Sequence, residues 1–432
     1  MLIWIVNPFD PLPGEREQLG RYGFLARCLR QAGHGVVWWS SAFSHRFKRP
    51  VEAGPIAQAA RAAGLEVRLL PAPPYSRNVS FARLRNHRRL ALEFAAAAPT
   101  APRPDLILAS SPPLELAARA VELGRAWDRP TVVDIQDQWP DNFIRVTPRL
   151  LRPLSRLLFQ PYYAWERRAY RAADAIVGVA DGYVQRGLRV GGAKRWTGTF
   201  PLGVDLADVA AAMQRGVARY GDRWRKPPDQ VWFLYSGSLS HAYDFLTIVR
   251  AAVPAQATFS DRVRFILTGT GELAPQAANL VARHGLRNVT LTGFLDFDEW
   301  ACVLSRADVG FNASFPEALI YFPNKIFYYL AAGAAVLNTI PGQCAALVDR
   351  ARCGLNYPAG DADACFAAVR RLVTAPDERR AMGAAARRLA EEVFDRRIVY
   401  TEMTRFLEQV ARAARAPAAL NGSVPPRSAP AR

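Results

Sequence analysis

The sequence predicts an α/β protein built from two doubly wound parallel sheets. Short apolar runs alternate with segments whose apolar residues recur about every 3.6 positions, as strands and covering helices do. Most of these runs end in glycine, serine or aspartate, which are common at the turns that follow strands. The whole pattern starts again near residue 230, and a length of 432 residues favours more than one domain.

The first half of the chain contains five expected strands, the first of which is LIWIV. They cover residues 2–6, 35–41, 65–70, 105–111 and 131–137. Helical patterns separate them, beginning with RYGFLARCLRQAGH at 21–34. Ligands of such sheets bind beyond the carboxyl ends of the strands, so functional residues are expected in the segments that follow these runs.

The second half repeats this order after a polar connection. Its expected strands cover 231–238, 262–272, 288–294, 307–314, 334–340 and 354–360. We therefore expect a first domain over 1–204, a linker over 205–229 and a second domain over 230–395, with a cleft between the domains. A long final helix is expected over about 381–415, of which 396–415 packs back on the first domain. Residues 416–432 have the composition of a disordered tail.

The composition is strongly basic. Lysine and arginine number 56 against 38 acidic residues, a formal net charge of +18, and only four of the cations are lysines. Such a charge predicts attraction to an anionic partner: a phosphorylated substrate, a membrane surface or a nucleic acid. The five cysteines form no C-x-x-C pair, which indicates reduced thiols in a cytoplasmic protein. The N-terminal apolar run is too short for a signal peptide, and no apolar run is long enough to span a membrane.

One basic segment stands out at residues 149–171. It holds six arginines and one acidic residue, interleaved with leucine and aromatic residues. Two interpretations remain open. The segment lies in a membrane interface, or it is a helical part of the first domain with a solvated basic face.

Ordered blocks along the chain resemble a known family. In the second half these are YSGSL (235–239), LTGTGE (267–272), NVTLTGF (288–294), PNKIFYYLAAGAAVL (323–337) and GLNYPAGDADACFAAV (354–369). In the first half they are NPFDPLPGERE (7–17), GRYGFLARCL (20–29), GHGVVWWSSAFSH (33–45), DLILASSPP (105–113) and DIQDQWPD (134–141). The set resembles the retaining glycosyltransferases of GT-B fold, family 4, of the bacterial cell-surface polysaccharide type.

The glycine-containing turns of the second half suit a nucleotide. Glycine permits a tight strand-to-helix turn and lets backbone amides approach a phosphate. The resemblance implies that the diphosphate lies near Gly237 and Ser238. It also implies that base and ribose lie against the strand ends that carry Gly269, Gly271 and Gly293.

The block PNKIFYYLAAG predicts a helix that begins at Pro323-Asn324 and stops at Gly333. Lys325 falls in its first turn, where a cation opposes the helix dipole, so we interpret it as a catalytic phosphate ligand. Asn324 and Tyr328 are assigned to the same donor site.

This block departs from the family pattern. Tyr328 occupies the place of the second of two family glutamates, and Ile320 stands eight residues earlier. Glu317 is the nearest carboxylate and becomes a candidate catalytic residue. The segment SHAYD (240–244) replaces the basic pair that many relatives carry after the first glycine turn.

The first domain offers further candidates. By resemblance, Gly14 belongs to a flexible loop over the donor, and Arg21 on the next helix faces the phosphates. Asp137 follows an expected strand and is a candidate catalytic or sugar-orienting carboxylate. Its alternative role is a helix N-cap. His45 meets a substrate or is a structural histidine.

No metal site is expected. The triplet Asp361-Ala-Asp363 is better explained by helix capping than by metal binding.

The resemblance implies a metal-independent hexosyltransferase that uses a nucleotide-sugar donor and a lipid-linked or phosphorylated glycan acceptor. Lipopolysaccharide or exopolysaccharide biosynthesis is the expected setting, in the cytoplasm with a peripheral contact at the anionic inner membrane. Two alternatives stay open: a GT-B nucleotide-sugar 2-epimerase, and a non-catalytic basic protein that binds nucleic acid.

Overall fold

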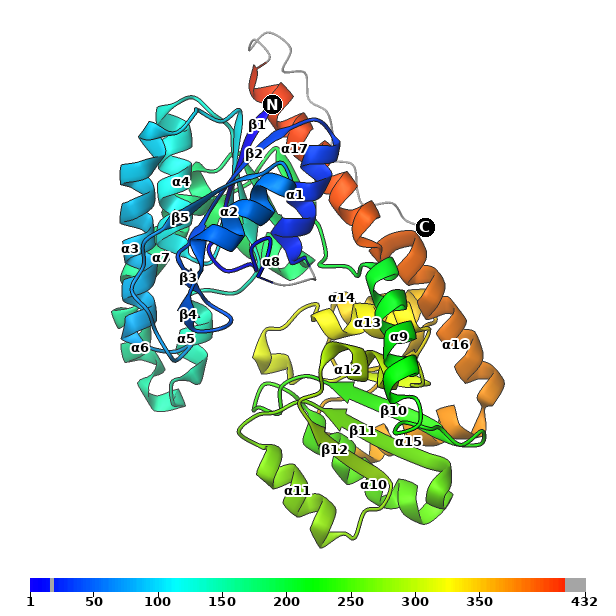
Figure 1. Ribbon diagram of the computed structural model, residues 1–432. Helices are drawn as coiled ribbons and strands as arrows, with labels where there is room; N and C mark the ends of the chain where they lie inside the picture. The colour runs from blue at the N-terminus through cyan, green and yellow to red at the C-terminus, as the bar shows by residue number, and fades with distance from the viewer. Residues whose placement is uncertain (16–18, 416–432) are drawn as a thin grey trace. The chain divides into compact units, whose positions relative to one another are not determined.

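The computed structural model describes residues 1–15 and 19–415, and it divides into two compact units (Figure 1). The first unit begins at Met1 and ends at Phe200, and it takes up the chain again from Tyr400; the second is Pro201–Val399. The expected tail at 416–432 lies outside the described residues.

The first unit is a seven-stranded parallel sheet in the order β5-β2-β1-β6-β7-β8-β9. Its strands are β1 (Leu2–Val6), β2 (Gly35–Ser41), β5 (Glu66–Leu70), β6 (Leu106–Ser111), β7 (Thr131–Ile135), β8 (Ala175–Gly178) and β9 (Trp196–Thr199). A small antiparallel pair, β3 (Phe43–Ser44) and β4 (Arg49–Pro50), follows β2.

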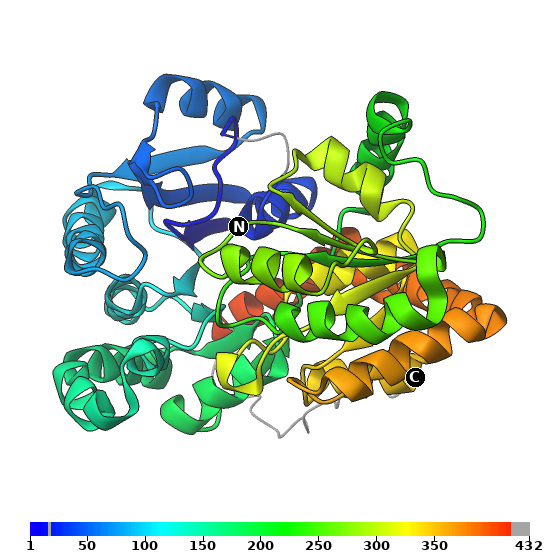
Figure 2. The same ribbon diagram turned by 90° about the horizontal axis from the view of Figure 1, so that it is seen from below.

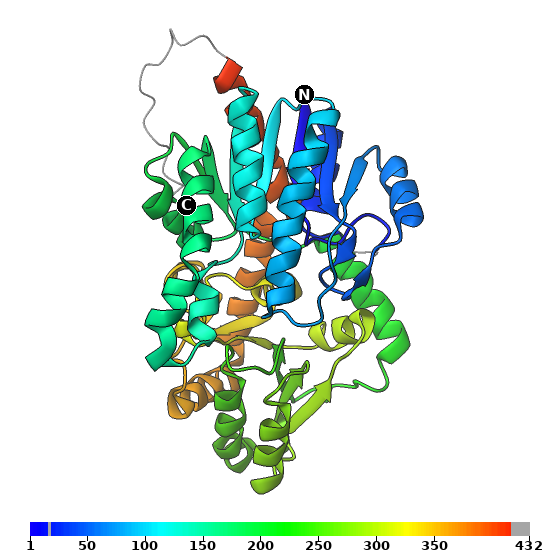
Figure 3. The same cartoon turned by 90° about the vertical axis from the view of Figure 1, so that its left-hand side faces the viewer.

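Helices connect these strands. They are α1 (Arg21–Gln31), α2 (Ala53–Ala62), α3 (Phe81–Ala97), α4 (Leu114–Ala126), α5 (Asp141–Val146), α6 (Arg152–Leu158), α7 (Gln160–Ala172) and α8 (Asp181–Gly191). Short 3₁₀ turns lie at η1 (Ala98–Thr100) and η2 (Arg149–Leu151). Figure 3 shows α3 and α4 side by side against one face of the sheet.

The core of this unit is aromatic. The Trp4 ring meets the rings of Trp39, Phe94 and Trp127 edge to face, at centroid distances of 5.0, 6.2 and 5.6 Å. Helix α17 (Arg396–Arg415) packs on the same unit through Tyr400, whose ring lies 5.5 Å from that of Phe24. Aromatic pairs of this size contribute large buried areas, which fixes the sheet and its helices as one body.

The second unit is a six-stranded parallel sheet in the order β12-β11-β10-β13-β14-β15. Its strands are β10 (Val231–Ser236), β11 (Val263–Thr268), β12 (Val289–Gly293), β13 (Val309–Asn312), β14 (Ala335–Asn338) and β15 (Gly354–Asn356). Its helices are α9 (Leu206–Tyr220), α10 (Phe245–Phe259), α11 (Ala274–Arg283), α12 (Phe297–Leu304), α13 (Asn324–Ala332), α14 (Gln343–Ala351), α15 (Ala362–Thr374) and α16 (Pro376–Leu389). Short turns occur at η3 (Ser260–Arg262), η4 (Pro316–Ala318) and η5 (Ala390–Phe394).

Helices cover both faces of this sheet (Figures 1 and 2). Alternate residues of β10 point to opposite faces, as the pleat requires. Phe233 and Tyr235 join the core under α10 and α15, where Phe233 stacks on Phe265 with the ring centroids 5.2 Å apart. Ser236 points to the other face, where Trp300 of α12 and Tyr329 of α13 bond to it. Both faces are therefore buried, which explains the continuous apolar runs of the sequence.

The predicted fold class is confirmed: both sheets are parallel and are covered by alternating helices. Residues 205–229, expected to be a linker, contain α9, which packs closely on α12. The single final helix expected over 381–415 is instead α16, a π-helical turn and α17, because Asp395 takes an extended conformation between them. Strands β8 and β9 were not among the expected strands.

No described helix is long and apolar enough to cross a membrane.

Candidate active site

Lys325 is the most unusual side chain at the carboxyl edge of the second sheet. It lies in the first turn of α13, which has no acidic residue there and ends at Gly333 in the left-handed conformation, as predicted. Its ammonium lies 4.0 Å from the centroid of the Tyr235 ring and 4.4 Å from that of Tyr243. The Nζ atom is buried and has no hydrogen-bond acceptor among the described residues. Burial lowers the pKa of Lys325 to about 7.

An unpaired buried cation costs free energy, and an anion bound beside it would offset that cost. The two tyrosine faces stabilise the ammonium in part through their π electrons. The exposed N–H groups at the start of α13 add positive potential in the same place. The arrangement fits a phosphate or diphosphate group.

The glycine turns adjoin this lysine. Gly237 has φ of 145°, and a Cβ atom there would stand 3.0 Å from Nζ of Lys325. At Gly269, with φ of 132°, a Cβ atom would stand 1.9 Å from the carbonyl oxygen of Gly237. At Gly271 a Cβ atom would stand 2.3 Å from the oxygen of Leu239. The turns after β10 and β11 therefore pack backbone against backbone, and only glycine permits it.

Gly293 ends the adjoining strand β12, and its oxygen accepts the N–H of Gly269 at 2.8 Å. Ser238 is exposed, and its carbonyl accepts the hydroxyl of Tyr235 at 2.9 Å. The structure therefore brings the predicted residues Gly237, Ser238, Gly269, Gly271, Gly293 and Lys325 to one edge of the sheet.

Tyr328 and Tyr329 of α13 have different roles. Tyr329 is buried, and its hydroxyl accepts the backbone N–H of Ser236 at 2.9 Å. Tyr328 is half-buried and meets the Trp300 ring edge to face, with 5.0 Å between centroids. Trp300 in turn donates to the Ser236 hydroxyl at 2.8 Å. Aromatic packing thus surrounds Tyr328, at the position where the family resemblance implied a glutamate.

The loop 240–244 completes the surroundings of Lys325. Tyr243 comes from this loop, and the Ser314 hydroxyl donates to the oxygen of Ala242 at 2.8 Å. This bond ties the loop to the segment after β13.

Glu317 is exposed on η4 and lines a separate pocket of about 620 Å³, together with residues that include Phe315, Asn338 and Thr339. No contact joins Glu317 to Lys325 within the described part of the chain. Asn324 is exposed beside Lys325 at the start of α13.

Arg21, predicted to face phosphates, is buried inside the first unit. Its guanidinium pairs with Asp134 at 2.7 Å and 3.1 Å, and it donates to the oxygen of Phe200 at 2.7 Å. Asp134 also accepts the hydroxyl of Tyr22 at 2.7 Å. The pKa of Arg21 is raised despite its burial, because the Asp134 carboxylate lies beside it. These bonds tie β7 to α1 and to the end of β9.

Asp137 lies in the loop between β7 and α5. One carboxylate oxygen accepts the N–H of Gln138 at 2.8 Å and also the side-chain amide of Asn142. The N-cap of α5 is Pro140, so Asp137 is not the capping residue. Burial raises its pKa, and Arg83 opposes part of that rise.

His45 lies among cationic side chains of the same unit. Its Nδ1 bonds to the Tyr75 hydroxyl, and Lys48 donates to the oxygen of His45 at 2.6 Å. Burial, with Arg83 and Lys48 nearby, lowers the pKa of His45 to about 3. His45 is therefore neutral at physiological pH. It lines a pocket of about 360 Å³ with Phe9, Asp10, Pro11, Arg46, Lys48 and Asn78.

Gly14 takes a left-handed conformation, with φ of 87°, in a turn that is closed by a bond from Leu12 N–H to the Glu15 carboxylate at 2.7 Å. The rest of the predicted loop, 16–18, lies outside the described residues.

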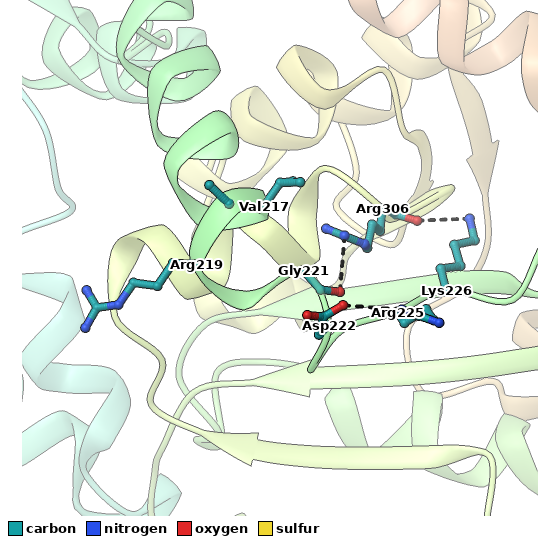
Figure 4. A pocket seen from close by; sticks show the side chains of 8 residues that line it. Val217, Arg219, Gly221, Asp222, Arg225, Lys226 and Arg306 are labelled. Carbon is teal, nitrogen blue, oxygen red and sulfur yellow. Dashed lines mark hydrogen bonds and ion pairs between the residues drawn. The ribbon is translucent and has the colours of Figure 1, made fainter.

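Another pocket of the second unit, of about 400 Å³, lies at the opposite edge of its sheet (Figure 4). Its walls come from the end of α9 and the segments before β10 and β13, with Lys226 donating to the oxygen of Arg306 at 2.9 Å. Because ligands of parallel sheets bind at the carboxyl edge, this pocket is not the candidate site.

Asp361 caps α15 by accepting the N–H of Ala364 at 2.8 Å, as the capping interpretation predicted. Within residues 1–15 and 19–415, no three His, Cys, Asp or Glu side chains gather as metal ligands would.

Several residues of the site were missed by sequence reasoning. Tyr235 and Tyr243 stand inside the motifs quoted above, but nothing in their spacing indicates that both rings face Lys325. Arg83 carried no signal, because Asp137 is distant in sequence and Tyr75 lies in the segment before α3.

Comparisons with known proteins agree with this architecture. Residues 23–203 match the family described as a glycosyl transferase 4-like domain, and residues 230–375 match the family described as glycosyl transferases group 1. A search of curated protein sequences found no match.

Solved structures of low sequence identity share the fold. Sucrose-phosphate synthase from Thermosynechococcus elongatus is 18% identical with a TM-score of 0.68, covering 95% of this chain and 99% of its own. HepE of Anabaena, solved in complex with UDP, is 15% identical with a TM-score of 0.66, covering 95% and 100%. WaaG, described as a glycosyltransferase involved in lipopolysaccharide biosynthesis, is 14% identical with a TM-score of 0.61, covering 96% and 100%.

Proposed function

The chain is a glycosyltransferase of the GT-B type, and on that premise we propose that it transfers a hexosyl group from a nucleoside-diphosphate sugar. The acceptor is a lipid-linked or phosphorylated precursor of a cell-surface glycan, and the anomeric configuration of the sugar is retained. The reaction takes place in the cytoplasm.

The observation that carries this proposal is the buried ammonium of Lys325, which has no hydrogen-bond acceptor among the described residues. A diphosphate placed beside Gly237 and the first turn of α13 supplies the missing acceptor. As the bond from the anomeric carbon to the phosphate oxygen breaks, negative charge grows on that oxygen. Lys325 and the nearby backbone N–H groups stabilise this charge more than they stabilise the bound donor.

The acceptor hydroxyl supplies the new bond to the anomeric carbon. We propose retention without a covalent glycosyl-enzyme, in which the hydroxyl attacks from the side on which the diphosphate departs and the leaving phosphate oxygen takes its proton. Asp137 is proposed to orient the acceptor and to take no part in stabilising the leaving diphosphate. Glu317 is proposed to bind hydroxyl groups of the donor sugar.

We propose that no metal takes part. The lysine ammonium and the positive end of α13 supply the charge that a divalent cation supplies elsewhere. HepE of Anabaena has been solved in complex with UDP and with UDP-glucose, which supports a nucleotide-sugar donor for this chain as well.

Thermal shift measurements with UDP, GDP, ADP, dTDP and their common sugars, each with and without EDTA, test the proposal. We expect one nucleotide to raise the Tm selectively and equally in both conditions. Loss of the nucleotide-induced Tm shift in EDTA would contradict the proposal that no metal takes part. Absence of any shift, together with no turnover of radiolabelled donor sugars, would contradict the proposal. Conversion of the donor to its C2 epimer without an acceptor would favour the epimerase.

A further inference from the structure

Five exposed leucines stand together on η2 and α6 of the first unit. They are Leu150, Leu151, Leu154, Leu157 and Leu158, with exposed fractions of 94, 53, 56, 67 and 69%. We call this set the leucine ridge. Single exposed leucines are common on protein surfaces, but five within nine residues are not, and such patches mark interaction sites.

The chain segment that carries the ridge has charges of one sign. From Asn142 to Trp165 the sequence contains four arginines and no acidic residue. Arg149 and Arg156 are exposed, and neither guanidinium group pairs with a carboxylate among the described residues, although Arg156 lies near enough to Tyr163 to affect the pKa of its hydroxyl. Arg152 donates to the oxygen of Thr147 at 3.3 Å, which holds it against the helix start. The ridge is therefore an apolar surface flanked by free cations.

The outward direction of the leucines is built into the fold. On the opposite side of α6, Ser155 is buried and its hydroxyl lies 3.1 Å from that of Thr147. The rings of Phe143 and Phe159 stack with 5.0 Å between centroids and close the base of the segment. The leucines thus remain exposed while the helix that carries them is anchored on the unit.

Anchoring continues into α5 and α8. The Asp141 carboxylate, at the start of α5, pairs with Arg186 of α8 and accepts the hydroxyl of Tyr163. Arg186 also pairs with the buried Glu166 at 2.7 Å.

The ridge stands at the functional end of its sheet. The segment from α5 to α6 follows β7 directly after Asp137, and Figures 1 and 3 show it at the end of the unit where the parallel strands terminate. An acceptor that meets Asp137 approaches this same end.

We propose that the leucine ridge docks the protein on the surface of an anionic phospholipid bilayer. The leucines enter the acyl boundary while the free arginines meet the phosphate groups of the lipids, a pairing of apolar and cationic groups that interfacial helices use. A second copy of the chain is the weaker occupant, because two ridges would bring unpaired arginines together. The inference rests on the proposed function and deepens it, since a lipid-linked acceptor lies at such a surface.

The first test is co-sedimentation of the full chain with vesicles, without donor or acceptor. We expect binding to vesicles of phosphatidylglycerol and phosphatidylethanolamine, weaker binding in high salt, and little binding to phosphatidylcholine alone. The variant Leu154→Ser/Leu157→Ser/Leu158→Ser should bind at least about tenfold more weakly, because three exposed leucines that would enter the acyl boundary are lost. Equal binding by this variant would overturn the proposal.

Matched controls test whether the effect depends on where the leucines and arginines lie, and not only on their number. Leu92→Ser changes an exposed leucine of α3 with an exposed fraction of 50%, and it should bind as the wild type does. Arg149→Gln/Arg156→Gln should lose salt-sensitive binding, whereas Arg283→Gln/Arg287→Gln, which removes the same charge from the second unit, should keep it. Unchanged Tm in all variants is expected, because every changed side chain is exposed.

A label gives a second measurement that does not depend on affinity. All five native cysteines are buried, so Leu154→Cys offers a selectively reactive thiol for an environment-sensitive fluorophore. A blue shift on addition of anionic vesicles is expected, and the same label in Leu92→Cys should not respond. If the label instead responds to protein concentration, and sedimentation equilibrium shows a dimer that the ridge variant loses, a second copy occupies the ridge and the proposal fails.

These readouts also separate the inference from the proposed function. Vesicle binding without a nucleotide-induced Tm shift would support the membrane role of the leucine ridge and contradict the transferase mechanism. A nucleotide-induced Tm shift without vesicle binding would support the transferase mechanism and contradict the membrane role.

Discussion

Lys325 and Gly237 face each other so closely that a Cβ atom at position 237 would stand 3.0 Å from the lysine Nζ. The glycine therefore leaves room beside the ammonium for an incoming group. No described residue offers the ammonium a hydrogen-bond acceptor, so the room and the unpaired charge belong to the same site. This relationship leads to the first three predictions.

Replacing Lys325 by alanine is expected to lower kcat at least about tenfold while the fold survives, because the charge on the leaving phosphate loses its nearest cation. Lys325→Met keeps most of the side-chain volume and removes the unpaired ammonium. It should raise the stability of the free protein at pH 6 by roughly 1–3 kcal/mol and abolish the Tm shift by nucleotide. Steady-state kinetics and thermal unfolding measure both effects.

Lys226→Met is the matched control, because Lys226 is ion-paired with Asp308. That variant should lose stability and keep the nucleotide shift. Wild-type turnover in Lys325→Ala would remove Lys325 from the mechanism.

The pKa of about 7 for Lys325 predicts two opposite pH effects. Between pH 7 and the unfolded value of 10.5, the unfolded chain carries a proton on this amine that the folded chain has lost. The stability of the free protein, relative to Lys325→Met, should therefore rise with pH across this window.

Nucleotide binding should change the other way. A bound diphosphate favours the charged amine, so affinity should fall as pH rises above 7 and binding should take up a proton. Calorimetry in buffers of different ionisation enthalpy measures that uptake. A pH-independent Kd, or the same profile in Lys325→Met, would contradict the assignment.

Gly237→Ala should weaken nucleotide binding and destabilise the second unit. The backbone at φ of 145° is strained for alanine, and the added methyl group enters the space beside Lys325. Gly285→Ala is the control: φ is 56° there, and a Cβ atom meets nothing within 4 Å. It should cost about 1 kcal/mol through backbone strain and leave the Kd for nucleotide unchanged. Equal Kd values for both variants would separate Gly237 from the site.

Arg21→Met should destabilise the first unit by about 3–5 kcal/mol, because it leaves the buried Asp134 carboxylate without its partner. We expect the nucleotide shift of Arg21→Met to remain, since the guanidinium is occupied inside the unit. The double variant Arg21→Met/Asp134→Leu should recover part of the lost stability. If a folded Arg21 variant loses nucleotide binding, the original assignment of Arg21 to the phosphates regains support.

Asp137→Asn keeps the shape of the side chain and removes its charge. If Asp137 orients the acceptor, kcat should fall by about 10²-fold while the KM for the donor changes little. Asn142→Asp is a useful contrast, because Asn142 donates to the same carboxylate and an added negative charge should raise the pKa of Asp137 further. A parallel loss of donor affinity in Asp137→Asn would assign the residue to the donor instead.

The order of strands and helices could be predicted because the spacing of apolar residues agrees with the placement of turn residues along most of the chain. The strand 231–236 and the helix from Asn324 to the glycine stop were read from local signals alone. The break at Asp395 could not be read this way, since residues 381–415 keep a helical pattern throughout. The break is the extended backbone of Asp395, which no residue type in this stretch marks.

The candidate site also combines features that local sequence signals predict with features that they do not. Glycines at strand ends are a local signal, and in the structure they lie beside Lys325 at the carboxyl edge of the second sheet. Partners from distant segments left no such signal. Arg21 and Asp134 are 113 residues apart, so nothing in either neighbourhood indicated an ion pair. The leucine ridge was visible as a basic, apolar stretch, but only the burial of Ser155 showed which side faces out.

The contact between Gly237 and Gly269 also limits which substitutions this sequence can accept. A side chain at Gly269 would collide with main-chain atoms, which no compensating substitution elsewhere can shorten. The two positions are therefore coupled through the backbone and not through exchangeable side chains. In a saturation library every surviving clone should retain both glycines, whereas Gly333, which is left-handed helical and whose added Cβ would meet its nearest atom at 3.5 Å, should admit asparagine.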